Sequence, residues 1–190
     1  EAHGAVRRWI VDETGMAKKG SHSVGVARQY CGELGKIENC QVLVSLSVAN
    51  EVAALPVAAR LYLPEAWADD PERRDAAGVP LDVTFQTKPS IALELIGRAL
   101  AGGVPPGMVL ADEVYGSTAE FRRGVAGLGL DYALAVRSTT PVSPPCSGRR
   151  ARLWHNQEGP LSVRALAARL PRSAWRWITS LTVMAGASLD

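Results

Sequence analysis

The segment 41–48 constrains the fold of this 190-residue chain more than any other part of the sequence. Its even positions, from Val42 to Val48, are all apolar, whereas Ser45 and Ser47 stand among its odd positions. Such a period of two is typical of an extended strand that buries one of its two faces. The pattern therefore predicts a half-buried β-strand at 41–48.

Two shorter extended runs precede this strand. Residues 7–12 have a β-branched apolar centre and end at the polar break 12–15, and residues 24–30 form the second run. Glycine and polar residues at 18–21 and 32–39 are typical of the turns between strands. Three consecutive strands with short turns predict an antiparallel meander.

The next part of the chain alternates helical and extended patterns. Apolar residues at helical spacing predict a helix over 90–100, which ends at Gly102-Gly103. The apolar run 108–111 is typical of a strand, and the capping-box pattern at 117–120 predicts a second helix. Residues 132–136 have the composition of a short buried strand. This order predicts an α/β layer arrangement with an antiparallel start.

Composition and charge divide the chain into three parts. We expect a folded core over 1–137, a linker rich in Ser, Thr, Pro and Gly over 138–150, and a basic C-terminal segment over 151–190. Residues 1–148 hold 14 basic and 17 acidic side chains, whereas residues 149–190 hold 7 and 2. A basic segment of this kind either lies against phosphates or forms a solvated face.

Several protein classes do not fit the composition. The cysteines Cys31, Cys40 and Cys146 form no C-x-x-C pair, so neither a disulfide framework nor a zinc site is indicated. The apolar stretch 42–48 is far shorter than the roughly 20 residues of a membrane helix. Since the chain begins without Met or an apolar signal segment, we expect a cytosolic protein and a piece of a longer reading frame.

Two aspartates follow apolar strands in this arrangement. If the strands that end near Asp12 and Asp112 are parallel neighbours, both carboxylates emerge at the same edge of the sheet. Carboxylate oxygens are ligands that Mg²⁺ prefers, and paired metal ions serve phosphoryl transfer. An acid at a strand end is also common as a solvated turn residue or a helix cap, so the pattern leaves both interpretations open.

Five blocks of the sequence stand out in order along the chain, at residues 9–15, 18–30, 59–67, 85–89 and 110–116. Together these blocks resemble the catalytic domain of IS701-type insertion-sequence transposases. This family belongs to the DDE superfamily, whose endonuclease domains have an RNase H-like fold. The resemblance runs from about residue 6 to about residue 178, and the sequence beyond it is not recognised. It implies a mixed sheet of three antiparallel strands followed by helix, strand, helix and strand, with an incomplete C-terminal part.

The resemblance also implies a function. Asp12 on the first strand and Asp112 on the fourth correspond to the first two acids of the DDE triad. The implied cofactor is Mg²⁺ or Mn²⁺, the implied partners are transposon ends and target DNA, and the implied reaction is strand cleavage followed by transfer. A homodimer in a synaptic complex is left open, and we expect a cytoplasmic, nucleoid-associated bacterial protein.

The third acid of the triad is not found in this sequence. After Val136 the only carboxylates are Glu158, which lies between residues that oppose a helix, and Asp190, the final residue. The family's N-terminal DNA-binding region is also not found. We therefore expect a truncated chain whose catalysis is impaired, as a frameshift or an early stop would produce.

Other charged residues are weaker candidates. Lys18 and Lys19 in the first turn and Lys88 before the helix are predicted to contact DNA, although each is also typical of a solvated surface. Glu13 and Glu113 neighbour the proposed metal ligands, but on an extended strand they would point to its opposite side.

Two alternative functions remain open at this point. The first is a nucleic-acid-binding or interaction domain without catalysis. The second is a phosphatase-like enzyme with Asp12 as nucleophile, but that architecture begins with a parallel βα unit and not with a hairpin.

Overall fold

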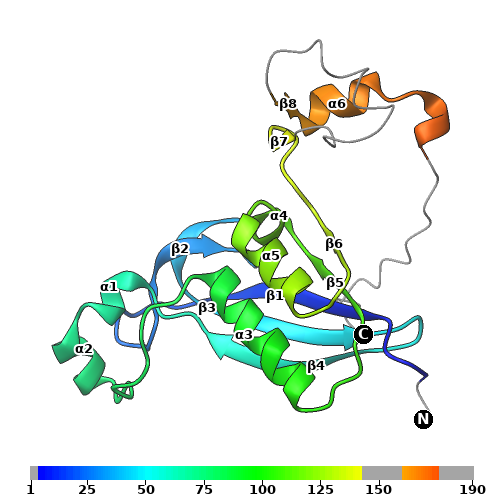
Figure 1. Ribbon diagram of the computed structural model, residues 1–190. Helices are drawn as coiled ribbons and strands as arrows, with labels where there is room; N and C mark the ends of the chain where they lie inside the picture. The colour runs from blue at the N-terminus through cyan, green and yellow to red at the C-terminus, as the bar shows by residue number, and fades with distance from the viewer. Residues whose placement is uncertain (1–3, 143–159, 176–190) are drawn as a thin grey trace, which may run out of the picture. The chain divides into compact units, whose positions relative to one another are not determined.

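The computed structural model describes residues 4–142 and 160–175 (Figure 1). The chain divides into two compact units, Glu1–Val136 and Arg137–Asp190. The first unit contains a six-stranded mixed sheet and helices, which confirms the predicted α/β fold class. Its elements are β1 (Arg8–Ala17), β2 (Ala27–Cys31), β3 (Lys36–Ala49), β4 (Ala54–Leu61), α1 (Glu65–Ala68), α2 (Pro71–Ala76), α3 (Lys88–Ala101), β5 (Met108–Ala111), α4 (Glu113–Gly116), α5 (Ala119–Gly127) and β6 (Tyr132–Leu134).

The long strand β3 organises the sheet. Strands β2, β3, β1, β5 and β6 follow one another across it, and β4 also pairs with β3. Strand β1 pairs with residues 40–49 of β3, while β2 pairs with 36–40 and β4 with 43–49. Because a strand has only two edges, β2 and β4 lie one after the other along the edge of β3 that faces away from β1. The pairs of β1 with β5 and of β5 with β6 are parallel.

Helices α3 and α5 lie over one face of this sheet (Figure 1). Helix α3 presents its buried residues at helical spacing, as its sequence predicts. Burying each large apolar side chain stabilises the fold by about 1.5–3 kcal/mol. The core between helices and sheet includes Trp9, Val11, Val44, Leu46, Ile91, Ile96, Val109, Phe121 and Val125.

The opposite face of the sheet carries smaller and more polar side chains near its centre. In the antiparallel ladder Asp12 lies opposite Ser45, and Ile10 lies opposite Ser47. Asp12 is exposed and the two serines are half-buried. The odd positions of 41–48 therefore face away from the main core, in agreement with the predicted alternation.

Strand β1 does not end at the polar break that the sequence indicated. It continues through Asp12 and Gly15 to Ala17, because β3 offers a paired residue at every position up to Cys40. Ladder pairing thus overrides the low strand propensity of Asp and Gly. Asp12 is consequently a residue within a strand and not one that follows a strand.

Gly15 also has a steric role in this strand. A Cβ atom at Gly15 would lie 3.0 Å from the Cα of Cys31, so the absence of a side chain lets the hairpin of β2 and β3 approach β1 closely.

Strand β4 was not predicted, and Asp112 therefore follows the fifth strand instead of the fourth. The sequence of β4 is rich in alanine and contains Pro56, neither of which favours a strand. Proline is tolerated here because β4 pairs only with β3, and a register shift in that ladder lies beside Ser47, the partner of Pro56.

The helical predictions are confirmed with two differences. Helix α3 begins with Thr87 as N-cap, whose side chain accepts a hydrogen bond from the amide of Ser90, and it ends before Gly102. Helix α5 begins after Thr118 without a side-chain cap, so the predicted capping box does not form. The Thr118 hydroxyl instead donates to the carbonyl of Val114, in the short helix α4, which was not predicted.

Strand β6 is less buried than the sequence predicted. It lies at the edge of the sheet and pairs with β5 alone, so Tyr132 is exposed and the strand is not the buried one expected.

The second unit is described over 137–142 and 160–175. It contains β7 (Pro141–Val142), which pairs with β8 (Leu161–Ser162), followed by α6 (Val163–Arg169) and the 3₁₀ helix η2 (Arg172–Ala174). Residues 143–150 of the predicted linker, and most of the predicted basic segment, lie outside the described residues. Among the helices that are described, none combines the length and the apolar character that a membrane-spanning helix requires.

Candidate active site

The parallel ladder between β1 and β5 runs toward both predicted aspartates. The last residue pair of this ladder joins Ile10 to Leu110. Continuing that register by two residues sets Asp12 opposite Asp112, across neighbouring strands whose spacing is about 4.8 Å. Side chains alternate along a strand, so Asp12 lies on the same face as Ile10, away from the main core.

Backbone amides hold one oxygen of each carboxylate. Oδ1 of Asp12 accepts a hydrogen bond from the amide of Glu13 at 2.8 Å. Oδ1 of Asp112 accepts from the amide of Val114 at 2.9 Å, which makes Asp112 the N-cap of α4. Within residues 4–142 and 160–175, the Oδ2 atoms of both aspartates have no hydrogen-bond partner. Each exposed aspartate therefore has an oxygen to offer to another ligand.

This donor set fits a hard divalent cation. Carboxylate oxygens suit Mg²⁺ and Mn²⁺, and Mg²⁺ is commonly held by one or two carboxylates together with water. In the described part of the chain no group of three or more His, Cys, Asp or Glu side chains is gathered for a metal ion. Glu158 and Asp190, the carboxylates weighed for the third position, lie outside the described residues.

Glu13, the residue after Asp12, points to the opposite face, as strand alternation predicts. It is partly buried and both of its oxygens are engaged. Its Oε2 lies 2.5 Å from Nζ of Lys88, at the start of α3, and its Oε1 accepts a hydrogen bond of 3.1 Å from the hydroxyl of Tyr115 in α4. Nζ of Lys88 also lies 5.4 Å from the ring centroid of Tyr62, within reach of a cation–π contact. These contacts connect β1 with both α3 and α4.

Tyr115 is fully buried and packs against Phe121, with ring centroids 5.3 Å apart. Burial raises the pKa of the Tyr115 hydroxyl, and the carboxylates of Glu13, Asp112 and Asp12 raise this pKa further. The hydroxyl therefore remains a proton donor to Glu13.

Close packing positions the short helix α4. A Cβ atom at Gly116 would lie 1.9 Å from the backbone oxygen of Ala135, so only glycine allows α4 to pack against the chain beyond β6. The guanidinium of Arg122 donates to the carbonyl of Gly116 and holds the end of α4 from the next helix.

The three lysines predicted to contact DNA lie in different places. Lys18 is half-buried and Lys19 is exposed in the turn after β1. At about 3.3 Å per residue, this turn is about 20 Å along the strand from Asp12. Lys88 instead lies beside Glu13, on the helical side of the sheet. Contact of any of these lysines with DNA stays a prediction.

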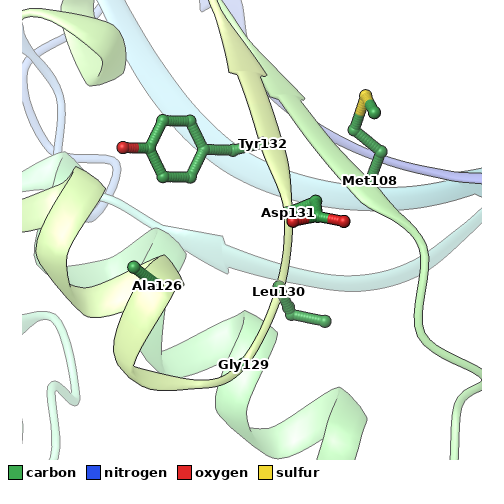
Figure 2. Close-up of a pocket in the computed structure, with 6 residues that line it drawn as sticks. All are labelled: Met108, Ala126, Gly129, Leu130, Asp131 and Tyr132. Carbon is green, nitrogen blue, oxygen red and sulfur yellow. The ribbon is translucent and has the colours of Figure 1, made fainter. Parts of the chain in front are cut away.

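An open cavity of about 610 Å³ lies elsewhere on the sheet (Figure 2). Met108 begins β5 and Tyr132 begins β6, whereas Asp112 follows the end of β5. The cavity is therefore at the opposite end of these strands and does not include the aspartates. Its lining residues are Met108, Ala126, Gly129, Leu130, Asp131 and Tyr132.

The contacts among Glu13, Lys88 and Tyr115 were not predicted as a group. Lys88 lies 75 positions and Tyr115 lies 102 positions after Glu13, and no spacing rule connects residues so far apart. The only signal in the sequence was that Glu13 directly follows Asp12 and that Tyr115 lies three residues after Asp112.

Known proteins similar to this chain support the same function class as the aspartate pair suggests, as the family match shows first. The family model described as DDE superfamily endonuclease matches residues 1–183. The chain is similar to the probable transposase for insertion sequence element IS701 from Microchaete diplosiphon, with 36% identity over 130 residues. That alignment covers 68% of this chain and 31% of the relative, so the chain spans about a third of the relative's length. No solved structure matches the chain. The family-model match covers almost the whole chain, which belongs to the DDE superfamily endonucleases.

Proposed function

We propose that this chain provides the catalytic core of an insertion-sequence transposase, which cleaves DNA strands at transposon ends and transfers them to a target. The main support is the parallel register of β1 and β5, which extrapolates to a pair of exposed aspartates on adjacent strands. The similarity to a probable transposase supports the choice of DNA as substrate.

Asp12 and Asp112 would hold the divalent cation of this reaction, Mg²⁺ or Mn²⁺. When bound, such an ion stabilises negative charge on the reacting phosphate and its attacking and leaving oxygens. The contribution of the chain is to hold two carboxylates at fixed spacing. Backbone amides orient one oxygen of each, which leaves the other oxygen for the cation.

We further propose that the 190-residue chain by itself is impaired in catalysis. Two carboxylates place less negative charge around a cation than the three acids of a DDE triad, so affinity and the positioning of a second ion decrease. Neither Glu158 nor Asp190 has the helical sequence context that the third acid requires.

DNA contacts are assigned to basic residues on separate elements. Lys18 and Lys19 form one candidate contact in the first turn, and Lys88, which pairs with Glu13 on the helical side of the sheet, is the other. The segment 149–190, with 7 basic and 2 acidic side chains, would add phosphate contacts. A homodimer in a synaptic complex and a cytoplasmic, nucleoid-associated location remain parts of this proposal.

A nicking assay tests the proposal. The substrate is a supercoiled plasmid that carries the ends of the insertion sequence, incubated with Mg²⁺ or Mn²⁺, and a full-length relative serves as positive control. We expect the chain to nick far more slowly than the relative, and any residual nicking to disappear in Asp12→Asn and in Asp112→Asn.

Three results would contradict the proposal. Cleavage at the rate of the relative would refute the impairment, and nicking that persists unchanged in Asp12→Asn would refute the assignment of the site. Hydrolysis of p-nitrophenyl phosphate that requires Asp12 and no DNA would instead support the phosphatase-like alternative.

A further inference from the structure

We propose that Tyr115, through its hydrogen bond to Glu13, is a positioning residue that sets the separation of Asp12 and Asp112. The inference rests on the proposed function, because it concerns the ability of these aspartates to share a cation. Neither Tyr115 nor Glu13 would touch the metal ion.

The backbone ladder alone does not fix this separation. Pairing between β1 and β5 comprises three residue pairs and ends at Ile10 and Leu110. Beyond it, β5 turns into α4 directly after Asp112, while β1 continues beside β3 to Ala17. The β1–β5 ladder therefore stops short of the two carboxylates, and a contact other than ladder hydrogen bonds has to fix their separation.

The hydrogen bond from Tyr115 to Glu13 spans this gap. Glu13 is the residue after Asp12, and Tyr115 lies three residues after Asp112, within the helix that Asp112 caps. The bond, 3.1 Å long, thus joins the two segments immediately beyond the end of their ladder. A hydrogen bond to an ionised carboxylate is about twice as strong as one between neutral groups.

Both ends of the bond are held by the rest of the fold. The ring of Tyr115 is buried against Phe121, and Gly116 allows α4 to pack on the backbone of Ala135. At the other end, Lys88 holds the second oxygen of Glu13 at 2.5 Å. The Tyr115 ring and the Glu13 carboxylate are each fixed in this way, so the hydrogen bond between them ties α4 to β1. Removing the hydroxyl removes this tie.

The charge of Glu13 serves the same end. Because Lys88 neutralises it, Glu13 adds little net charge near the cation. Its role in this arrangement is to accept the hydrogen bond, which separates the inference from simple attraction between a nearby carboxylate and a metal ion.

Direct Mn²⁺ titration of the full chain tests the inference, with free Mn²⁺ followed by its electron paramagnetic resonance signal. Tyr115→Phe removes one hydroxyl and no charge, and we expect it to weaken Mn²⁺ binding by about tenfold, the lower end of the loss typical when partners that orient metal ligands are removed. Tyr132→Phe is the matched control, since its hydroxyl belongs to an exposed residue at the other end of β6, and we expect its Mn²⁺ affinity to equal that of the wild type.

A pair of double variants covers the case in which Tyr115→Phe does not fold. Glu13→Gln with Lys88→Met and Glu13→Leu with Lys88→Met both remove the two charges, but only the first keeps an acceptor for the Tyr115 hydroxyl. We expect the glutamine version to bind Mn²⁺ within about twofold of the wild type and the leucine version to lose about tenfold.

The outcomes distinguish this inference from the proposed function. If Mn²⁺ binds the wild type, is lost in Asp12→Asn and is unchanged in Tyr115→Phe, the positioning role is refuted and the metal site stands. If the wild type does not bind Mn²⁺, both are refuted. A lower melting temperature of Tyr115→Phe with unchanged Mn²⁺ affinity would mean a purely structural tyrosine and would also refute the inference.

Discussion

Replacing Asp12 with Asn should make the metal-free protein more stable than the metal-free wild type. Once metal is added, the variant should be the less stable of the two proteins. In the proposed site without a cation, the continued register of β1 and β5 sets two negative charges on neighbouring strands. Asn has nearly the same shape, and its Oδ1 can still accept the hydrogen bond from the amide of Glu13. The substitution therefore removes charge and one metal ligand and leaves the local backbone contacts in place.

The size of the metal-free effect follows from the exposure of the site. Two charges 4 Å apart interact by about 1 kcal/mol in water and about 4 kcal/mol at an effective dielectric constant of 20. Both aspartates are exposed, so the lower figure applies. For a chain of this length, about 1 kcal/mol corresponds to a rise of about 2–4 °C in melting temperature.

The effect reverses when metal is present. A ligand at 100 times its dissociation constant stabilises the folded state by about 2.7 kcal/mol, which exceeds the relief of repulsion. We expect Mn²⁺ to raise the melting temperature of the wild type but not that of Asp12→Asn, so the order of the two proteins is inverted.

Differential scanning calorimetry with and without Mn²⁺ measures this inversion. Asp131→Asn is the control, because it removes an exposed carboxylate at the opposite end of the strands, and it should keep the Mn²⁺ response of the wild type. A metal-free Asp12→Asn that melts below the wild type, or one that keeps the full Mn²⁺ response, would refute the reasoning.

Three further predictions concern stability. Gly116→Ala should lower the free energy of unfolding by about 3 kcal/mol or more in urea denaturation, because the new Cβ would overlap the backbone oxygen of Ala135. A Cβ at Gly127 would meet no atom within 4 Å, so Gly127→Ala should be neutral or stabilising. Equal losses of stability in the two variants would contradict the packing of α4. The pKa of Tyr115 in the folded state is raised above its ordinary value of 10.0, so the stability that its hydroxyl contributes should be complete below about pH 10 and lost as the pH rises further. Melting temperatures measured above pH 10 should therefore fall more steeply for the wild type than for Tyr115→Phe. Parallel curves would argue against the buried hydroxyl. Thr87→Ala should cost about 1 kcal/mol by removing the N-cap of α3, as chemical denaturation would show, whereas no change would mean that the cap is not formed in solution.

Local patterns in the sequence predict those elements whose residues repeat at the period of the element. The alternation in 41–48 and the helical spacing in 90–100 correspond to β3 and α3, since both elements bury one face against the same core. Strand β4 escaped prediction because an edge strand has few buried positions and tolerates Ala and Pro. Strand β1 was predicted too short because its later residues are extended by their pairing with β3 and not by their own preference.

The candidate site likewise contains features that local sequence predicts and features that depend on the sheet. The residue types of Asp12 and Asp112, each next to an apolar run, were enough to single them out, because hard cations require carboxylates and local sequence shows where strands lie. Whether β1 and β5 are neighbours, parallel and in matching register is a property of the sheet, which no local pattern records.

The sequence by itself therefore determined the family, the main strands and helices, and the two acids. Only the tertiary structure decided that Lys88 meets Glu13 and that Glu13 meets Tyr115, and that β1 and β5 are parallel neighbours. The physical reason is that secondary structure follows from neighbours along the chain, whereas a contact between remote residues depends on how every intervening element packs.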